Sequence, residues 1–189
     1  MSLKLNSSGG GSVTLQEPTT ASTRTLNLPD NSGTVVSTGS TAVVSQAMLA
    51  SGVAGTGPAF MAIPSGTQSA NAGTFTKLNF GTELYDTNNN FASGRFTPTV
   101  AGFYQINAAT YISTGSQVEC VMALYKNGSP AAYMQNIVVP LGRQCAGSVL
   151  IYMNGTTDYV EAYTYTSTTV TVPNDGNLVY FQGFLARAA

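Results

Sequence analysis

From Ala59 onward, apolar and polar residues alternate with a period of two, and this pattern restricts the chain to β-structure. Residues 104–112 are a clear example, because every second side chain from Tyr104 to Ile112 is apolar or small. Turn signals such as Asn127-Gly128 and Asn154-Gly155 interrupt the alternation about every ten residues. Eight or more short strands with this spacing predict an all-β sandwich or jelly roll.

The first 57 residues differ from the rest, because they are rich in Gly, Ser and Thr and contain no Phe or Tyr. We predict two parts, residues 1–57 as an amino-terminal anchor or stem and residues 58–189 as a head domain. Short strands with few large side chains do not form a core of their own, so the anchor is expected to order only against other copies or a host surface. The alternative is an unstructured tail. The anchor candidates are the apolar residues of the expected strands: Val13, Leu15, Leu26, Leu28 and Val35.

The chain carries very little charge, with 7 Lys and Arg, 8 Asp and Glu, and a net charge of −1. Scattered cations give no footprint for a phosphate backbone, so nucleic acid is not expected as a partner. No apolar run approaches the roughly 20 residues that span a bilayer, so membrane insertion is not expected either. The first residues lack the apolar segment of a signal peptide, and synthesis and assembly in a host cytoplasm are therefore expected.

Residues that could support catalysis are scarce. The chain has no histidine, the commonest base for activating a nucleophile. A glycosidase-type pair of Glu119 and Glu161 is conceivable but disfavoured, and we predict that the protein is not an enzyme and has no bound cofactor. Calcium is the one ion worth considering, because Asp158 and Asp175 lie beside Asn154 and Asn174 in polar loops. Ordinary turn formation by Asn and Asp explains the same residues.

The two cysteines, Cys120 and Cys145, both fall on apolar positions of expected strands. We interpret them as buried thiols that behave as small hydrophobic side chains. A disulfide between them is the alternative.

Three motifs in the second part resemble one known family. Residues 91–106 (FASGRFTPTVAGFYQI), the segment Leu124-Tyr-Lys-Asn-Gly128 and the segment Phe181-Gln-Gly-Phe-Leu185 are similar, in order, to segments of complement globular-head and tumour-necrosis-factor-like jelly rolls. The resemblance covers about residues 58–189. It implies a ten-stranded jelly roll that forms a tight homotrimer.

Aromatic strands also favour self-association, because one sandwich rarely buries aromatic surface on both faces. Tyr159, Tyr163 and Tyr165 share one face of an expected strand. Their alternative role is ligand contact, since aromatic rings beside polar groups stack on sugars. The candidates for the trimer interface are Tyr104, Tyr159, Tyr163, Tyr165, Phe181 and Phe184.

The amino-terminal part resembles a second group of proteins. Gly11-Ser-Val-Thr-Leu15 and residues 25–38 (TLNLPDNSGTVVST) look like segments of tailed-phage fibres and related virion proteins. The combination implies a virion-surface protein: a trimeric fibre or decoration protein that attaches to capsid or tail by its amino terminus and displays the head for adhesion to a host glycan or protein. A capsid cement protein is the first alternative, and a soluble lectin-like or signalling trimer is the second.

Overall fold

The computed structural model describes residues 2–6, 8–16, 57–113, 117–139 and 142–189. The chain divides into two units, Met1–Ser40 and Thr41–Ala189, which are described separately. The anchor candidates Leu26, Leu28 and Val35 lie outside the described residues, so their role stays a prediction.

The described part of the first unit is a single hairpin of β1 (Ser2–Asn6) and β2 (Ser12–Gln16). Gly10 supports the turn with a φ of 84°, which glycine adopts without a steric penalty. The anchor candidates Val13 and Leu15 lie in β2, paired with Leu5 and Leu3 across the hairpin. A two-stranded hairpin is marginal by itself in water.

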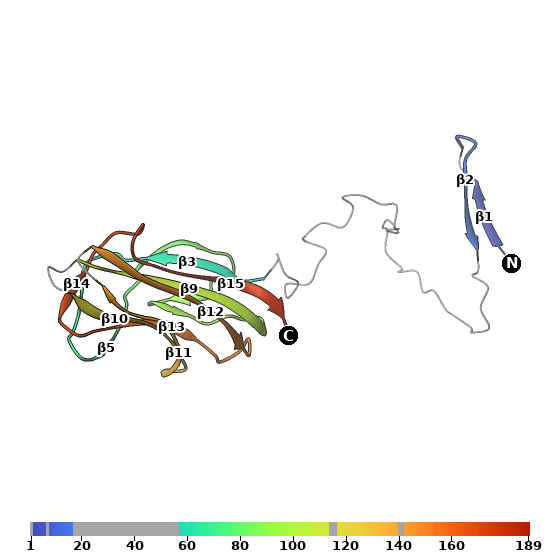
Figure 1. Ribbon diagram of the computed structural model, residues 1–189. Coiled ribbons are helices and arrows are strands. Elements are labelled where there is room, and N and C mark those ends of the chain that lie inside the picture. The colour runs from blue at the N-terminus through green and yellow to red at the C-terminus, as the bar shows by residue number, and fades with distance from the viewer. Residues whose placement is uncertain (1, 7, 17–56, 114–116, 140–141) are drawn as a thin grey trace. The chain divides into compact units, whose positions relative to one another are not determined.

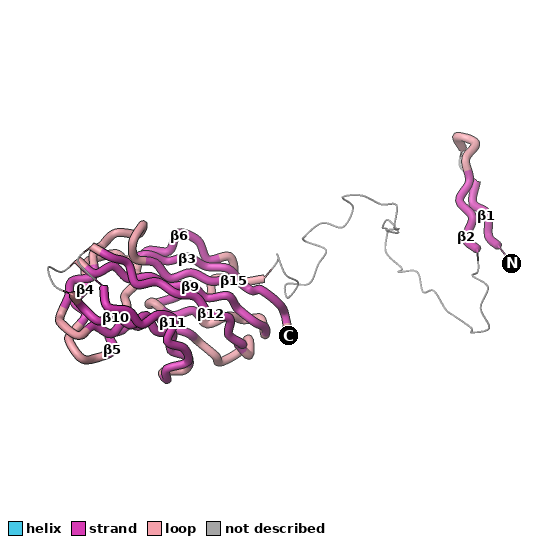
Figure 2. The backbone as a smooth tube through the Cα atoms, viewed as in Figure 1, coloured by secondary structure: helices cyan, strands magenta, loops and turns pink. Residues whose placement is uncertain are grey.

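The second unit is a sandwich of two antiparallel sheets (Figures 1 and 2). One sheet has five strands, in the spatial order β12-β9-β15-β3-β6. Its strands are β3 (Ala59–Ile63), β6 (Thr82–Asp86), β9 (Gly102–Ile112), β12 (Arg143–Met153) and β15 (Tyr180–Ala188).

The second sheet has the order β11-β10-β13-β8-β7, and β5 also pairs with β13. Asn127 and Gly128, with φ values of 53° and 80°, connect β10 to β11 and confirm the tight turn expected there. A two-stranded ribbon of β14 and β4 completes the described strands. The bounds are β4 (Gln68–Ala70), β5 (Phe75–Lys77), β7 (Phe91–Ala92), β8 (Arg95–Phe96), β10 (Val118–Lys126), β11 (Ser129–Val139), β13 (Val160–Thr166) and β14 (Val170–Val172).

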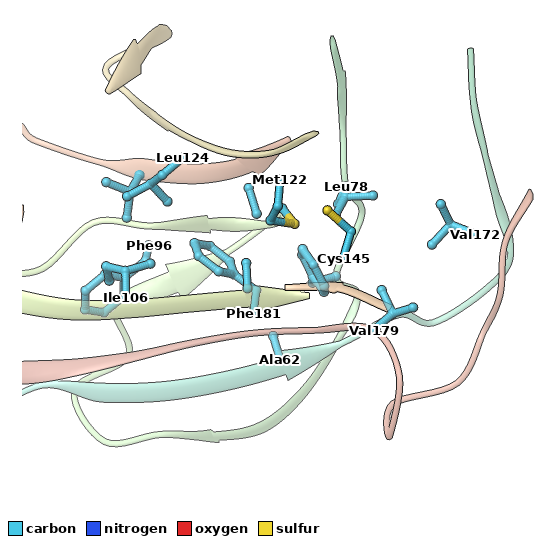
Figure 3. Packing of buried hydrophobic residues seen from close by; sticks show 14 of the residues in the cluster. Ala62, Leu78, Phe96, Ile106, Met122, Leu124, Cys145, Val172, Val179 and Phe181 are labelled. Atoms are coloured by element: carbon cyan, nitrogen blue, oxygen red, sulfur yellow. The ribbon is translucent and has the colours of Figure 1, made fainter. Parts of the chain in front are cut away.

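The core lies between the two sheets, and Figure 3 shows side chains from both of them meeting there. Phe60 is fully buried and stacks on Phe96 with ring centroids 4.3 Å apart, while Phe181 meets it edge-on at 5.0 Å. Tyr104 is also fully buried, and its hydroxyl donates a hydrogen bond to the carbonyl of Val100 at 2.8 Å. Burial raises the pKa of Tyr104 to about 12. Aromatic residues thus form the centre of the sandwich.

This architecture confirms the expected all-β jelly roll. The long strands alternate as predicted, with Tyr104, Ile106, Ala108, Thr110 and Ile112 all buried on the inner face of β9. Several ladders are extended by strands of two or three residues, such as β7 and β8, so the described part contains more strand segments than the ten expected. The described residues include no helix, and hence none long and apolar enough to cross a membrane.

The outermost strands of the two sheets, β11 and β12, touch along one side of the sandwich. Gly147 makes this approach possible, because a Cβ atom at this position would lie 2.5 Å from the Cβ of Met134 and 2.8 Å from its carbonyl oxygen. Nearby, the backbone N–H of Ala146 donates to the side-chain oxygen of Gln135 at 2.6 Å. The two sheets are therefore fastened together at this edge.

Candidate functional site

The outer face of the five-stranded sheet carries large apolar side chains that remain half exposed. Phe103 of β9 lies opposite Tyr152 of β12, with ring centroids 5.5 Å apart. Gln105 lies between Leu150 on one side and Phe184 on the other. Cross-strand partners share a face, so these side chains project together from the sheet. We call the surface formed by Phe103, Leu150, Tyr152 and Phe184 the uncharged face; these residues are 40%, 55%, 43% and 49% exposed.

Neutral polar residues continue the uncharged face in one direction along the sheet, and at its other end the Lys126 ammonium lies 5.8 Å from the ring centroid of Tyr152. Asn107 lies opposite Ser148 and Gln182, which continues the same outer face along the sheet. Among the outward positions of β9, β12 and β15, the only charged side chain is that of Arg187, opposite Phe103 at the end of β15. An exposed apolar surface with no central charge is typical of protein–protein contact.

The outer face of the other sheet carries a second aromatic group, which we call the aromatic row: Phe75, Tyr125, Tyr133, Tyr163 and Tyr165. Its rings contact one another. Tyr125 and Tyr163 stack with centroids 3.9 Å apart, and Phe75 lies 5.5 Å from Tyr165 and 5.6 Å from Tyr133. Each such ring pair contributes roughly 0.5–1.5 kcal/mol to stability beyond the burial of its surface area. Contacts within the aromatic row therefore hold its rings in position.

Strand register builds the aromatic row. Tyr165 of β13 is paired with Phe75 on one side and Val121 on the other, and Ala123 of β10 is paired with both Tyr163 and Tyr133. The small residue Ala123 is fully buried beneath the rings. The row therefore depends on a small side chain at the position where the rings converge.

A buried carboxylate continues the same face. Only 4% of the Glu161 side chain is exposed, and one of its oxygens accepts hydrogen bonds from Lys77 at 2.7 Å and from Arg95 at 3.0 Å. Burial alone would raise the pKa of Glu161, but the two cationic hydrogen bonds outweigh burial and lower it. The Arg95 guanidinium also lies 3.7 Å above the ring centroid of Tyr159. These contacts fix both cations in place.

Lys77 and Arg95 also line a polar pocket of about 560 Å³. Its other walls come from the loop segments around β7 and β8. Glu161 neutralises one of the two positive charges, which leaves a local charge of about +1. The remaining lining residues are Asn89, Asn90, Ala92, Ser93, Thr97 and Thr99.

The calcium candidates serve as turn residues. Asp158 accepts hydrogen bonds from the Asn127 amide and the backbone of Asn154, and it forms an ion pair with Lys126 at 2.7 Å. Burial would raise the pKa of Asp158, but these contacts outweigh it and lower the pKa. The side-chain oxygen of Asn154 accepts three backbone N–H groups. A calcium ion would have to displace these donors, so this loop does not favour a cation.

The other two calcium candidates lie in the turn between β14 and β15. Asp175 accepts a hydrogen bond from the backbone of Asn177 at 2.9 Å, and Asn174 is its exposed neighbour. Within the described residues, no cluster of three or more His, Cys, Asp or Glu side chains could hold a metal.

The conceivable glycosidase pair is ruled out by the register of β10 and β13. Glu161 lies opposite Tyr125, and Glu119 lies six residues from Tyr125 along β10. At about 3.3 Å per residue the separation is roughly 20 Å, far beyond the roughly 5–9.5 Å of glycosidase carboxylates.

Both cysteines are free and fully buried in the core. The Cys145 thiol lies 3.6 Å from the carbonyl oxygen of Cys120. A hydrogen bond with the Cys120 side chain and burial both raise the pKa of Cys145, so its thiolate is disfavoured.

The structure places the predicted interface candidates in four different surroundings. Tyr104 and Phe181 were wrong candidates, because both are fully buried inside one protomer and present no surface to another copy. Phe184 belongs to the uncharged face. Tyr163 and Tyr165 belong to the aromatic row, and Tyr159 lies just before β13 beneath Arg95.

Sequence reasoning missed most of both surfaces. Phe103, Leu150 and Tyr152 alternate with buried or partly buried residues, so the period of two contained a signal for them. Phe75, Tyr125 and Tyr133 are brought together by pairing between distant strands, which periodicity within one strand does not reveal.

Comparison with solved structures supports the fold. Two crystal structures of murine APRIL, at pH 8.5 and pH 8.0, each align with a TM-score of 0.52 over 68% of this chain and 98% of theirs, at 7% identity. The globular domain of zebrafish complement 1qA protein aligns over 70% of this chain and 98% of its own, with a TM-score of 0.49 and 16% identity. No protein-family model and no curated protein matches the sequence. The head therefore has the jelly-roll fold seen in the APRIL structures.

Proposed function

We propose that this chain is a homotrimeric virion-surface protein whose jelly-roll head is displayed for adhesion and whose amino-terminal segment attaches it to the particle. The uncharged face carries this proposal. Four large apolar side chains stand half exposed on one sheet, with charge only at the end where Arg187 lies opposite Phe103 and Lys126 lies near Tyr152. Another copy of the chain would present the same apolar surface to cover them.

Energetics favour covering this face. Fully burying a Phe or Leu side chain stabilises by about 1.5–3 kcal/mol, so four half-exposed residues per protomer supply on the order of several kcal/mol. Jelly rolls of the complement-head type form tight homotrimers, which favours three copies around one axis. The test is sedimentation of the purified full chain at micromolar concentration, where a trimer is expected. A stable, soluble single subunit would contradict the proposal.

The placement on a virion rests on the amino-terminal segments, whose sequence resembles attachment regions of tailed-phage fibres. Three heads on one stem, and many stems on one particle, would convert weak single contacts into strong adhesion. Immunogold labelling of intact particles is expected to show outward-facing heads.

A capsid cement protein is the alternative, because a trimer that clamps capsid subunits needs the same neutral interface. The two roles differ in what the particle loses when the trimer is removed. Loss of an adhesion fibre lowers adsorption to the host and leaves particle stability unchanged. Loss of a cement protein lowers the stability of particles to heat or osmotic shock, and this result would favour the alternative.

A further inference from the structure

Tyr133 lines two hollows, one on the outer face of the second sheet and one along the first residues of β11. It is 63% exposed, and its ring is nearly parallel to that of Phe75, with 8° between the planes. One hollow has a volume of about 240 Å³ and is lined by Phe75, Val121, Tyr133, Asn136 and Tyr165. The other has a volume of about 310 Å³ and is lined by Tyr133 together with Pro130, Ala131 and Ala132. We call the two hollows together the tyrosine cleft.

The lining of the tyrosine cleft has a specific chemistry. It offers aromatic faces, an amide and phenolic hydroxyls, and it contains no charged residue. Two carboxylates lie near the cleft on this face: Glu119, two residues from Val121 along β10 and outside the lining, and Glu161, which is satisfied by Lys77 and Arg95. A ligand that fits here is neutral, has a flat face of C–H groups that packs on a ring, and has hydroxyls that bond to Asn136. Sugars have these three properties.

We propose that the tyrosine cleft binds a neutral saccharide, with two adjacent sugar rings in the two hollows and Tyr133 between them. Each hollow is at or below the lower end of the roughly 300–1,000 Å³ of pockets for drug-sized ligands, so each has room for about one sugar ring. The aromatic contacts hold Phe75 and Tyr165 in position before the ligand arrives, which lowers the entropic cost of binding.

Two other occupants fit less well. A proline-rich peptide binds aromatic grooves as an extended helix, and a continuous groove is needed for its length, whereas Tyr133 divides this cleft. A second copy of the chain is expected to bind the uncharged face, which lies on the opposite sheet, and not the cleft. The saccharide site deepens the proposed adhesive role, but its chemistry depends on one protomer alone.

The test uses the full chain and four neutral disaccharides: lactose, maltose, cellobiose and N,N′-diacetylchitobiose. Saturation-transfer NMR is expected to show contact with at least one of them. The chain has ten tyrosines and no tryptophan, so tyrosine fluorescence provides a second measure of the same binding. Sialyllactose is expected to bind no more tightly than lactose, because the cleft offers no partner for its carboxylate.

Three variants locate the site. Tyr133→Ala is expected to weaken binding at least about tenfold, because both hollows lose a wall, while Tyr133→Phe keeps the ring and retains most of the affinity. Tyr85→Ala is the matched control, since Tyr85 is 47% exposed on β6 of the other sheet, and it is expected to bind normally. Sedimentation and circular dichroism of each variant check its assembly and folding.

Four outcomes would overturn the inference. They are no contact with any of the four disaccharides, unchanged binding by Tyr133→Ala, binding of a proline-rich decapeptide in place of sugars, and dissociation of the trimer by Tyr133→Ala, which would make the cleft a contact between copies. A wild-type chain that sediments as a single subunit and still binds sugar at the cleft would contradict the trimeric function alone.

Discussion

The two sheets expose aromatic side chains to solvent in opposite ways. In the aromatic row the rings contact one another, from the Phe75–Tyr133 stack to the Tyr125–Tyr163 stack 3.9 Å apart. On the uncharged face, the Phe103–Tyr152 pair is the only ring contact among the described residues, and Phe184 and Leu150 project without an aromatic partner. We therefore expect the aromatic row, whose rings already contact one another, to suit a small ligand, and the uncharged face to suit contact with another protein.

The largest expected effect follows from placing a charge on the uncharged face. In the proposed trimer, Phe184→Asp would bury an unpaired carboxylate between copies, which costs several kcal/mol. We expect the trimer to dissociate, with sedimentation at micromolar concentration as the measurement. Tyr133→Asp, the same kind of change on the opposite sheet, is expected to leave the trimer intact. If both variants or neither dissociated, the two faces would not differ in the way described.

The next effect concerns Glu161, which fixes the cations beside the aromatic row. Glu161→Gln leaves Lys77 and Arg95 without their counter-charge and is expected to destabilise the protein by about 1–3 kcal/mol; the lower part of this range is expected, because both cations are partly exposed. Urea unfolding measures the change. Glu119→Gln, on the neighbouring strand, is the matched control and is expected to cost less than about 0.5 kcal/mol.

The same carboxylate predicts a pH dependence. Because folding lowers the pKa of Glu161, its ionised form stabilises the native state above the unfolded pKa of about 4.3. That contribution is lost as the pH falls through the lower, folded pKa. Wild-type stability is therefore expected to drop more steeply on acidification than that of Glu161→Gln. Equal slopes in thermal unfolding from neutral to acidic pH would show that the ion pairs contribute nothing.

A smaller effect is expected from breaking the tightest stack in the aromatic row. Tyr163→Ala removes the ring that lies 3.9 Å from Tyr125 and is expected to cost about 1–2 kcal/mol without dissociating the trimer. Tyr163→Phe keeps the stack and is expected to retain most of the stability. Dissociation of the trimer by Tyr163→Ala would instead place the interface on this sheet.

The smallest effect is expected at Tyr133, because 63% of this residue is already exposed. Tyr133→Ala is expected to change the free energy of unfolding by no more than about 0.5–1 kcal/mol, measured by urea titration. A much larger loss would mean that the residue is a structural part of the sheet rather than one wall of a cleft.

Much of the fold was predictable from the sequence, because strand periodicity and turn chemistry are local. The Asn127-Gly128 turn and the alternation of β9 are both as expected. The side of the sheet that faces the core is not a local property. Tyr104, Phe181 and Phe184 are all aromatic residues in the middle of predicted strands. Tyr104 and Phe181 nevertheless point into the core while Phe184 is exposed, because a shift of one residue along a strand reverses the face.

The candidate surfaces were less predictable for the same reason. The aromatic row joins residues from β5, β10, β11 and β13, whose register is set by packing across the whole sandwich. Tyr163 and Tyr165 were recognisable as one face of a strand, but their neighbours Phe75 and Tyr133 were not. The contact between Arg95 and Tyr159 likewise joins residues 64 positions apart in the chain.

The contact of Gly147 with Met134 affects whether the outer strands of the sandwich can pair with another copy of the chain. Exposed outer strands allow β-proteins to polymerise strand upon strand, and β11 and β12 are the outermost strands of their sheets. In this sandwich β11 and β12 contact each other at Gly147 and Met134. The side chain of Gln135 also accepts the backbone N–H of Ala146, which an incoming strand would need for pairing. This edge is therefore protected against strand-by-strand pairing with another copy of the chain.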